Sequence, residues 1–356
     1  MGKNKIILTG GGSTGHVSVN LALIPLLKKH GYEIHYIGSK KGIEKELITK
    51  IPDVRYHEIS TGKLRRFISF ENFIDFFRVI LGIFQSIWKI FKIKPQVVFS
   101  KGGYVSVPVI IGAWINGVPS LAHESDLTPG LANKLVQPFI KNIFTTFPET
   151  NKYIKSNKGI YLGPVIREDL LNGDKDKIQK ELNLNPNKKT MLVMGGSLGA
   201  KFINKFIHKN LDKLLQEFNI IHATGKNGLD KNINKKNYYQ FEYINSGLNN
   251  ILAASDIVIS RSGSNAIFEF LYYKIPMLLI PLPTTQSRGD QIDNAKSFKK
   301  QGFAEIIYEE DYTNDKMFET IQDICININH YKENMEKINF QNTTQKIFEK
   351  IEEIKK

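Results

Sequence analysis

The chain has 356 residues, of which 41% are hydrophobic and 24% charged, a globular composition whose length predicts two domains. The formal net charge is +14, and residues 1–163 contribute +12 of it through 22 basic and 10 acidic side chains. The first half is therefore expected to meet an anionic partner such as lipid headgroups, nucleic acid or a diphosphate. Cys325 is the only cysteine, which excludes an intramolecular disulfide and a cysteine metal cluster and favours a reducing, cytoplasmic compartment.

Short β-branched segments alternate with helical patterns, which predicts parallel sheets with helices on both faces. In the first half, strands are predicted over residues 5–9, 33–38, 96–100, 120–123 and 142–145. A helix is predicted over 20–30, ending before Gly31. No secretion signal is recognised, and the apolar stretch 79–88 is about half of the ~20 residues that a membrane-spanning helix needs.

The pattern restarts after Gly163-Pro164, where we expect the domain boundary. The strands predicted in the second half are 190–194, 219–224, 239–243, 256–260, 277–280 and 304–307. The expected domains are 1–163 and 164–340, and the polar helical segment 341–356 is expected to pack back on the first.

A first glycine turn, Gly10 to His16, follows the first strand and opens a helix. The backbone of Gly12, Ser13, Thr14 and Gly15 is suited to bind a phosphate, and His16 is a candidate general base. The simpler alternatives are a tight turn and a structural histidine. NAD binding is disfavoured because no acidic residue ends the second strand.

A second glycine turn, residues 195–200, repeats this arrangement in the other half, where Ser197 offers a hydroxyl to a phosphate. The loop 260–265 opens a helix carrying Glu269, which is suited to the two hydroxyls of a ribose unless it is simply a solvated side chain. A third polar segment, 290–295, follows the proline-rich loop 281–283. The pair Asp174 and Asp176 is interpreted as a chance match to a metal motif, and no metal is expected.

Together these motifs resemble the MurG family of bacterial glycosyltransferases, as do the stretches 101–106, 123–126, 163–167 and 261–263. The resemblance covers nearly the whole chain. It implies a GT-B fold, in which two Rossmann-like domains with parallel sheets face each other across the active-site cleft. It also implies transfer of N-acetylglucosamine from UDP-N-acetylglucosamine to a lipid-linked muramyl-peptide for peptidoglycan synthesis, without a cofactor.

The resemblance assigns roles to particular residues. It implies that Glu269 holds the ribose and that Ile244 packs near uracil. The donor-binding residues that it implies are Arg167, Ser197, Ile244, Ser264, Asn265, Glu269 and Gln291. The acceptor site is expected at residues 12–15 and Tyr104, with His16 as the first choice for the base. Asp126 replaces the asparagine common in the family and is a second candidate base, and Leu198 stands where glutamine is frequent.

The expected reaction is a single displacement, in which the acceptor 4-hydroxyl attacks the anomeric carbon, inverts it and forms a β-1,4 linkage. We expect the amides of the second turn and Arg167 to stabilise the leaving UDP. The protein is expected at the cytoplasmic side of the membrane, near the cell-wall synthesis machinery. Residues 63–67 and 73–91 are basic and apolar and are predicted to contact anionic lipid, although burial within the domain would explain part of the apolar pattern.

Three alternatives remain open from the sequence. A UDP-N-acetylglucosamine epimerase shares the fold and the glycine turns, and a glycolipid synthase would use diacylglycerol as acceptor. A basic nucleic-acid-binding protein is disfavoured because the basic residues flank an apolar helix instead of lining a groove with stacking aromatics.

Overall fold

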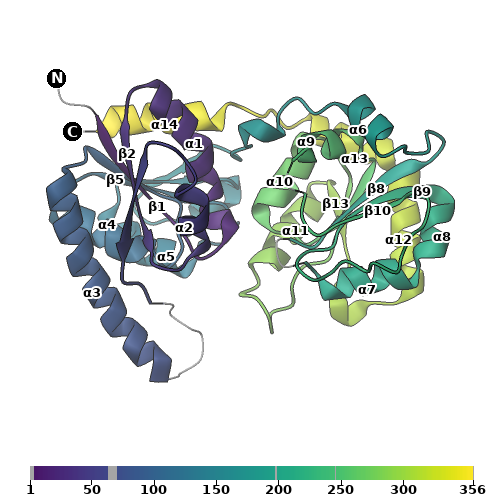
Figure 1. The fold of residues 1–356 in the computed structure, drawn as a ribbon, viewed down its shortest axis with the longest axis horizontal. Coiled ribbons are helices and arrows are strands. Elements are labelled where there is room, and N and C mark those ends of the chain that lie inside the picture. The colour runs from purple at the N-terminus through teal and green to yellow at the C-terminus, as the bar shows by residue number, and fades with distance from the viewer. Residues whose placement is uncertain (1–3, 63–69, 197–198, 245, 356) are drawn as a thin grey trace. The chain divides into compact units, whose positions relative to one another are not determined.

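The computed structural model describes residues 4–62, 70–196, 199–244 and 246–355 (Figure 1). The chain forms two compact units, one comprising Met1–Arg167 together with Gln341–Lys356 and the other comprising Glu168–Phe340. Each unit contains one sheet whose recorded strand pairs are all parallel, with helices on both faces. The predicted α/β class is confirmed.

The sheet of unit 1 has seven strands in the order β3-β2-β1-β4-β5-β6-β7. Their bounds are β1 Lys5–Thr9, β2 Glu33–Ser39, β3 Val54–Ile59, β4 Val97–Ser100, β5 Ser120–Glu124, β6 Asn142–Thr145 and β7 Gly159–Tyr161. The two edge strands, β3 and β7, are the two that sequence reasoning did not predict. β3 is half-exposed and carries charges, and β7 has only three residues, so neither has the continuous apolar pattern of a buried parallel strand.

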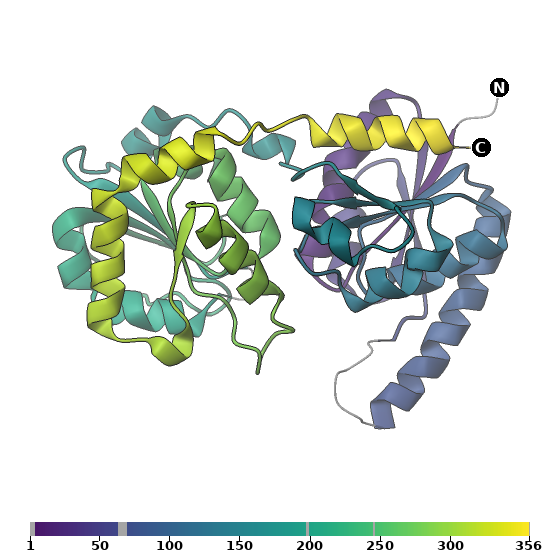
Figure 2. The same ribbon diagram turned by 180° about the vertical axis from the view of Figure 1, so that it is seen from behind.

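The helices of unit 1 cover the two faces of this sheet. Their bounds are α1 Ser18–Lys29, α2 Ile43–Ile48, α3 Phe70–Ile93, α4 Ser106–Ile115, α5 Leu131–Val136 and α14 Thr343–Ile354. Helices α1 and α14 pack on the face formed by Ile6 and Leu8, whereas α3 and α4 pack on the face of Ile7. The C-terminal helix α14 lies along α1, so the end of the chain completes the core of the unit that contains its beginning (Figure 2).

The sheet of unit 2 has six strands in the order β10-β9-β8-β11-β12-β13. Their bounds are β8 Lys189–Met194, β9 Phe218–Ala223, β10 Tyr238–Phe241, β11 Ile257–Ser260, β12 Met277–Leu279 and β13 Ala304–Ile306. Sequence reasoning predicted all six. The strand ends differ from the prediction by at most two residues, because hydrogen bonding and not composition ends a strand.

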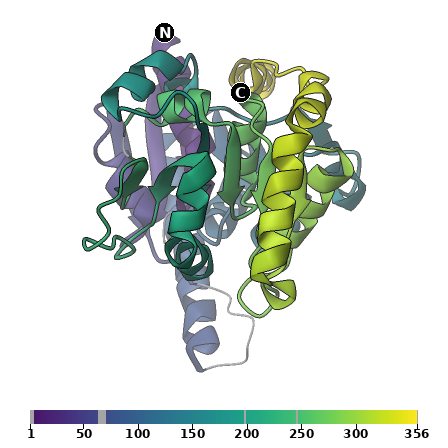
Figure 3. The same cartoon turned by 90° about the vertical axis from the view of Figure 1, so that its right-hand side faces the viewer.

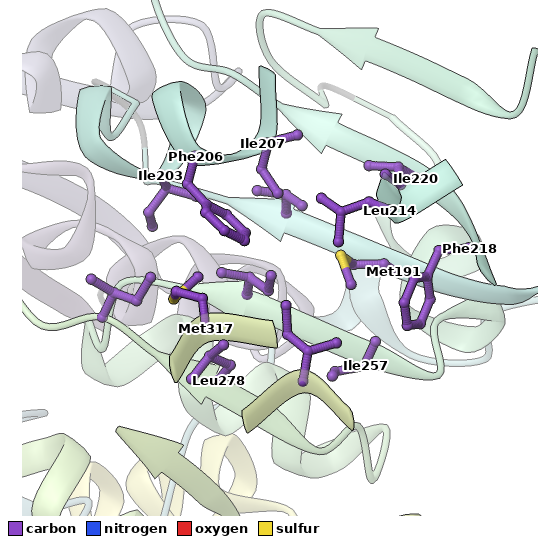
Figure 4. Packing of buried hydrophobic residues seen from close by; sticks show 14 of the residues in the cluster. Met191, Ile203, Phe206, Ile207, Leu214, Phe218, Ile220, Ile257, Leu278 and Met317 are labelled. Atoms are coloured by element: carbon purple, nitrogen blue, oxygen red, sulfur yellow. The ribbon is translucent and has the colours of Figure 1, made fainter. Parts of the chain in front are cut away.

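The helices of unit 2 enclose its sheet. Their bounds are α6 Lys175–Glu181, α7 Lys201–Lys209, α8 Leu211–Glu217, α9 Leu248–Ala254, α10 Ser264–Tyr272, α11 Asp290–Lys300, α12 Asn314–Ile326 and α13 Ile328–Glu336. On one face, Met191, Ile257 and Leu278 of the strands pack against Phe206 of α7 and Met317 of α12 (Figure 4). Figure 3, which looks onto this unit, shows α12 beside the sheet.

The strand order reverses at one point in each sheet, between β1 and β4 in unit 1 and between β8 and β11 in unit 2. In open parallel sheets, ligands bind beyond the carboxyl ends of the strands at such a switch point. The loops that follow β1, β4 and β5, and those that follow β8, β11 and β12, are therefore where a site is expected.

Candidate active site

The first glycine turn leaves β1 at the switch point of unit 1. Gly10 and Gly12 have φ values of 153° and 91°, which only glycine adopts readily. The Tyr36 hydroxyl donates a 2.7 Å hydrogen bond to the carbonyl of Gly10, and the Asn20 amide donates to that of Thr9 at 3.0 Å. Buried side chains therefore fix the course of the turn from below.

A buried carboxylate that sequence reasoning missed holds the side of this turn. Glu44 of α2 is fully buried, and it accepts hydrogen bonds from the amides of Gly12 and Ser39, both at 3.1 Å. A Cβ atom on Gly11 would lie 2.4 Å from the carboxyl carbon of Glu44. Because the Gly12 N–H already donates to Glu44, a phosphate at this turn would use the amides of the residues after Gly12. Those of Ser13, Thr14 and Gly15 open a helical segment, where the first N–H groups have no acceptor within the helix.

His16 ends the short helical turn Thr14–His16 and is half-buried. Its Nδ1 lies 2.9 Å from the hydroxyl oxygen of Ser13. Ser13 and Thr14 are exposed, and Gly15 is half-buried. The four residues therefore form an accessible polar ridge over the carboxyl end of β1.

The loop after β4 meets the first glycine turn face to face. Gly103 has a φ of 81°, and a Cβ atom on it would lie 2.2 Å from the carbonyl oxygen of Gly11. A Cβ atom on Gly12 would similarly lie 2.5 Å from the ring of Tyr104. Burial, reinforced by the charge of Glu44, raises the pKa of the Tyr104 hydroxyl. The structure thus brings Tyr104 and the predicted phosphate loop into contact.

A buried charged cluster supports the loop after β5, which carries Asp126. Glu124 accepts hydrogen bonds from the amide of Asp126 at 3.0 Å, the amide of Gly130 at 2.8 Å and the side chain of Asn133 at 2.9 Å. Lys101 is buried and donates to the hydroxyl of Ser125. Burial raises the pKa of Glu124 and lowers that of Lys101. Half-buried Asp126 is therefore held at the same sheet edge as the glycine turn, two strands away from β1.

The second glycine turn leaves β8 at the switch point of unit 2. Gly196 and Gly199 have φ values of 86° and 73°, and the Gly199 amide donates to the Gly196 carbonyl at 2.9 Å. The Ser260 hydroxyl donates to the Met194 carbonyl at 2.7 Å and ties β11 to the start of the turn. Ser197 and Leu198 lie outside the described residues.

The loop after β11 presents the predicted ribose and phosphate residues on α10. Ser264 is the first residue of this helix and is buried, whereas Asn265 and Glu269 are half-buried. Just before them, the buried Arg261 donates to the Ile280 carbonyl at 2.9 Å and forms a 2.5 Å ion pair with Glu309. Arg261 therefore joins the start of α10 to the end of β12, a structural role that the motif alone did not reveal.

Gln291 connects the neighbouring loops of unit 2. Its side-chain oxygen accepts from the Leu282 amide at 3.1 Å, and its carbonyl accepts from the Ser262 hydroxyl at 2.7 Å. The loops after β8, β11 and β12 are thus linked into one polar edge. The remaining predicted donor residues lie on other segments: half-buried Ile244 follows β10, and half-buried Arg167 ends the first segment of unit 1.

Helix α3 exposes an apolar face, which we call the aromatic face. Seven of its large side chains are more than half exposed: Phe73, Phe76, Phe77, Leu81, Phe84, Trp88 and Phe91. The opposite side is buried, and there a Cβ atom on Gly112 of α4 would lie 2.9 Å from the Cβ of Ser86. The Lys92 ammonium lies 4.0 Å from the centroid of the Trp88 ring. Figure 1 shows that the first turns of α3 extend beyond the body of unit 1. The basic residues 63–67 lie outside the described part of the chain.

The described residues contain neither a membrane-spanning helix nor a metal-binding cluster. No helix among them is long and apolar enough to cross a membrane. No group of three or more histidine, cysteine, aspartate or glutamate side chains among them is arranged to hold a metal ion. Asp174 of the acidic pair caps α6 by accepting the Lys177 amide at 3.1 Å.

Two family models match this chain: the glycosyltransferase family 28 N-terminal domain over residues 6–145 and the glycosyltransferase family 28 C-terminal domain over residues 190–351. The chain belongs to glycosyltransferase family 28. Membership of family 28 makes it a transferase of sugars, as the resemblance implied.

Curated relatives carry the name UDP-N-acetylglucosamine--N-acetylmuramyl-(pentapeptide) pyrophosphoryl-undecaprenol N-acetylglucosamine transferase. The relative from Geobacillus kaustophilus is 53% identical over 336 residues, which are 94% of each chain. The relative from Clostridium tetani is 49% identical over 98% of each chain.

Solved structures agree in fold. The Acinetobacter baumannii MurG structure has a TM-score of 0.78 at 21% identity, covering 99% of this chain and 100% of that one. A Staphylococcus aureus MnaA structure with UDP has a TM-score of 0.70 at 13% identity, covering 98% and 96%. The expected GT-B class, with two Rossmann-like units, is confirmed.

Proposed function

We propose that this family 28 enzyme transfers N-acetylglucosamine from UDP-N-acetylglucosamine to the undecaprenyl-pyrophosphoryl N-acetylmuramyl-pentapeptide. The observation that carries the proposal is the 53% identity, over 94% of both chains, to a relative named for this reaction. The acceptor 4-hydroxyl attacks the anomeric carbon, the bond to UDP breaks, and a β-1,4 linkage forms with inversion.

The polar edge of unit 2 is the proposed donor site. Glu269 takes the ribose hydroxyls, and Ile244 packs near uracil. The other proposed contacts of unit 2 to the nucleotide or its phosphates are Ser197, Ser264, Asn265 and Gln291. Arg167, which ends the first segment of unit 1, is a further proposed donor residue. The glycine turn and the N-terminus of α7 offer amides and a favourable dipole to the leaving diphosphate. A carboxylate for the ribose and amides for the phosphates are the groups that such a ligand requires.

The polar ridge of unit 1 is the proposed acceptor site. The amides of Ser13, Thr14 and Gly15 bind the acceptor diphosphate, with Tyr104 beside them. His16 accepts the proton of the attacking hydroxyl. Its position directly after a phosphate loop supports this role, because the base must lie within hydrogen-bond reach of a group held by that loop. Asp126 is the second candidate base.

The aromatic face of α3 is the proposed membrane contact. Exposed aromatic side chains beside Lys89 and Lys92 suit insertion at the headgroup level of an anionic bilayer. This surface would bring the enzyme to the cytoplasmic side of the membrane, where a polyprenyl-linked acceptor is embedded.

The main test supplies the purified enzyme with radiolabelled UDP-N-acetylglucosamine and either the muramyl-pentapeptide lipid or diacylglycerol. Label is expected only in the muramyl product, and degradation of that product should reveal a β-1,4 linkage. Conversion of the UDP-sugar to an isomer without transfer would instead establish the epimerase alternative.

The variant His16→Ala tests the proposed base. It is expected to lower kcat at least about a hundredfold while the donor KM stays within about twofold. Should Asp126→Ala lose kcat while His16→Ala retains it, the base would be Asp126.

A further inference from the structure

Four hydrogen bonds form a continuous chain through unit 2. The Tyr238 hydroxyl lies 3.1 Å from Nε2 of His208 and 2.9 Å from Nδ1 of His222. Nε2 of His222 lies 3.1 Å from Oδ1 of Asn204. The Nδ2 of Asn204 donates to the carbonyl oxygen of Thr224 at 2.9 Å. The chain thus runs from His208 of α7 across β10 and β9, returns to α7 at Asn204 and ends at Thr224, the residue that follows β9.

The direction of every proton in this chain follows from its last member. The Thr224 carbonyl can only accept, so Asn204 must present its NH2 group there and its oxygen to His222. Nε2 of His222 must then carry the proton, which leaves Nδ1 to accept from the Tyr238 hydroxyl. The Tyr238 oxygen in turn accepts from Nε2–H of His208. One orientation satisfies all four bonds, so the chain holds Asn204 in a single rotamer.

The Thr224 carbonyl is the point where this chain meets the second glycine turn. A Cβ atom on Gly199 would lie 2.2 Å from this oxygen, and one on Gly228 would lie 2.4 Å from it. Asn204 itself lies in the first turn of α7, where its backbone amide donates to the Ala200 carbonyl at 2.9 Å. Asn204 therefore connects the start of α7 to the Thr224 carbonyl, which Gly199 contacts.

We propose that Asn204, oriented by His222 and Tyr238, is a positioning residue for the donor diphosphate. The inference rests on the proposed function, since it assigns the turn at Gly199 to the UDP-sugar. Asn204 holds Thr224 against Gly199, and this fixes the position of Gly199 and of the α7 N-terminus that follows it. The network thereby preorganises the phosphate contacts instead of touching the donor.

A control residue for Asn204 lies at the amino end of β9, the end opposite Thr224. Asn219 is buried there, accepts from the Asn185 amide at 2.9 Å and donates to the Asn185 carbonyl at 3.0 Å. It resembles Asn204 in chemistry but lies at the amino end of the strand, away from the glycine turn. A role that is merely structural would make the two asparagines equivalent.

The test compares Asn204→Leu with Asn219→Leu, both neutral changes of similar volume, by calorimetric titration with UDP and by steady-state kinetics. Asn204→Leu is expected to raise the UDP Kd and the donor KM about tenfold, and to leave the acceptor KM unchanged. Asn219→Leu is expected to lower the urea midpoint without changing the UDP Kd. Equal UDP affinity in the two variants would overturn the inference.

A second pair of variants guards against misfolding. His222→Gln retains an N–H group that can donate to Asn204, whereas His222→Phe removes it. The glutamine variant is expected to bind UDP within about twofold of the wild type, and the phenylalanine variant about tenfold more weakly. Equal affinities in this pair would also contradict the inference. Failure of the wild-type protein to bind UDP or transfer sugar would instead contradict the proposed function, so the two failures are distinguishable.

Discussion

The hydroxyl oxygen of Ser13 lies 2.9 Å from Nδ1 of His16, one helical turn apart on the first glycine turn. For His16 to accept a proton through Nε2, the proton of the neutral ring must reside on Nδ1 and be donated to Ser13. Ser13 would thus select the reactive tautomer, as the partner of a catalytic histidine commonly does.

The variant Ser13→Ala is therefore expected to lower kcat about tenfold, because the ring loses the acceptor that fixes its tautomer. The donor KM should not change, since Ser13 lies in unit 1. Steady-state kinetics with varied donor measure both constants. Thr49→Ala removes an exposed hydroxyl of the same unit and is the matched control. An unchanged kcat in Ser13→Ala would show that Ser13 does not direct His16.

Replacing Glu44 should lower the unfolding free energy more than replacing an exposed carboxylate of unit 1. One oxygen accepts from the Gly12 amide and the other from the Ser39 amide, so Glu44→Gln must point an NH2 group at one of two donors. The expected cost is about 2 kcal/mol of unfolding free energy, measured by urea denaturation. Glu46→Gln changes an exposed side chain of the same helix and should cost less than about 0.5 kcal/mol. Similar losses in the two variants would refute the role given to Glu44.

Local patterns were sufficient to predict much of this fold. Eleven of the thirteen strands in the described part of the chain were predicted, because a buried parallel strand is a short apolar run between turn signals. The two glycine turns were also visible, since each lies between a strand and a helix. The strands missed, β3 and β7, lie at the sheet edges, where exposure breaks the apolar pattern.

The contacts that support the turns were not predictable in the same way. Glu44 is 32 positions from Gly12, and Asn204 is 18 from His222. In sequence both are ordinary polar residues of helices. Only the packing of helix on sheet shows that Glu44 is buried beside Gly11 and Gly12 and that the Asn204 side chain reaches the Thr224 carbonyl. The sequence motif marks the turn where we propose that a ligand binds, whereas the residues that hold the turn in shape come from helices elsewhere in the sequence.

The aromatic face of α3 predicts measurable lipid binding. Exchanging Phe84, Trp88 and Phe91 together for glutamine removes three exposed aromatic side chains without touching the buried side of the helix. Flotation with vesicles containing anionic lipid is expected to fall more than about tenfold, because each inserted aromatic contributes about 1 kcal/mol or more.

The control for lipid binding is Ile326→Gln, which changes a side chain of unit 2 that is 80% exposed and should leave flotation unchanged. The pair Lys89→Glu and Lys92→Glu is expected to weaken binding to anionic vesicles more than to neutral ones. Undiminished flotation of the triple aromatic variant would show that α3 is not the lipid contact.

His222 predicts a specific acid sensitivity of unit 2. Burial lowers the pKa of His222 to about 3, below the value of about 6.5 expected for an unfolded chain. Between these values the unfolded chain binds a proton that the native state does not, so the stability is lost as the pH falls from about 6.5 toward about 3. The loss due to this residue should reach about 2–3 kcal/mol at about pH 4.5.

Urea unfolding at about pH 7 and 4.5 measures this loss. The unfolding free energy should differ less between the two pH values in His222→Gln than in the wild type. In the control His330→Gln, which changes an exposed histidine, the full difference should remain. An equal pH dependence in His222→Gln and the wild type would mean that native His222 takes up a proton at about pH 4.5 as readily as the unfolded chain does, and the lowered pKa would then be wrong.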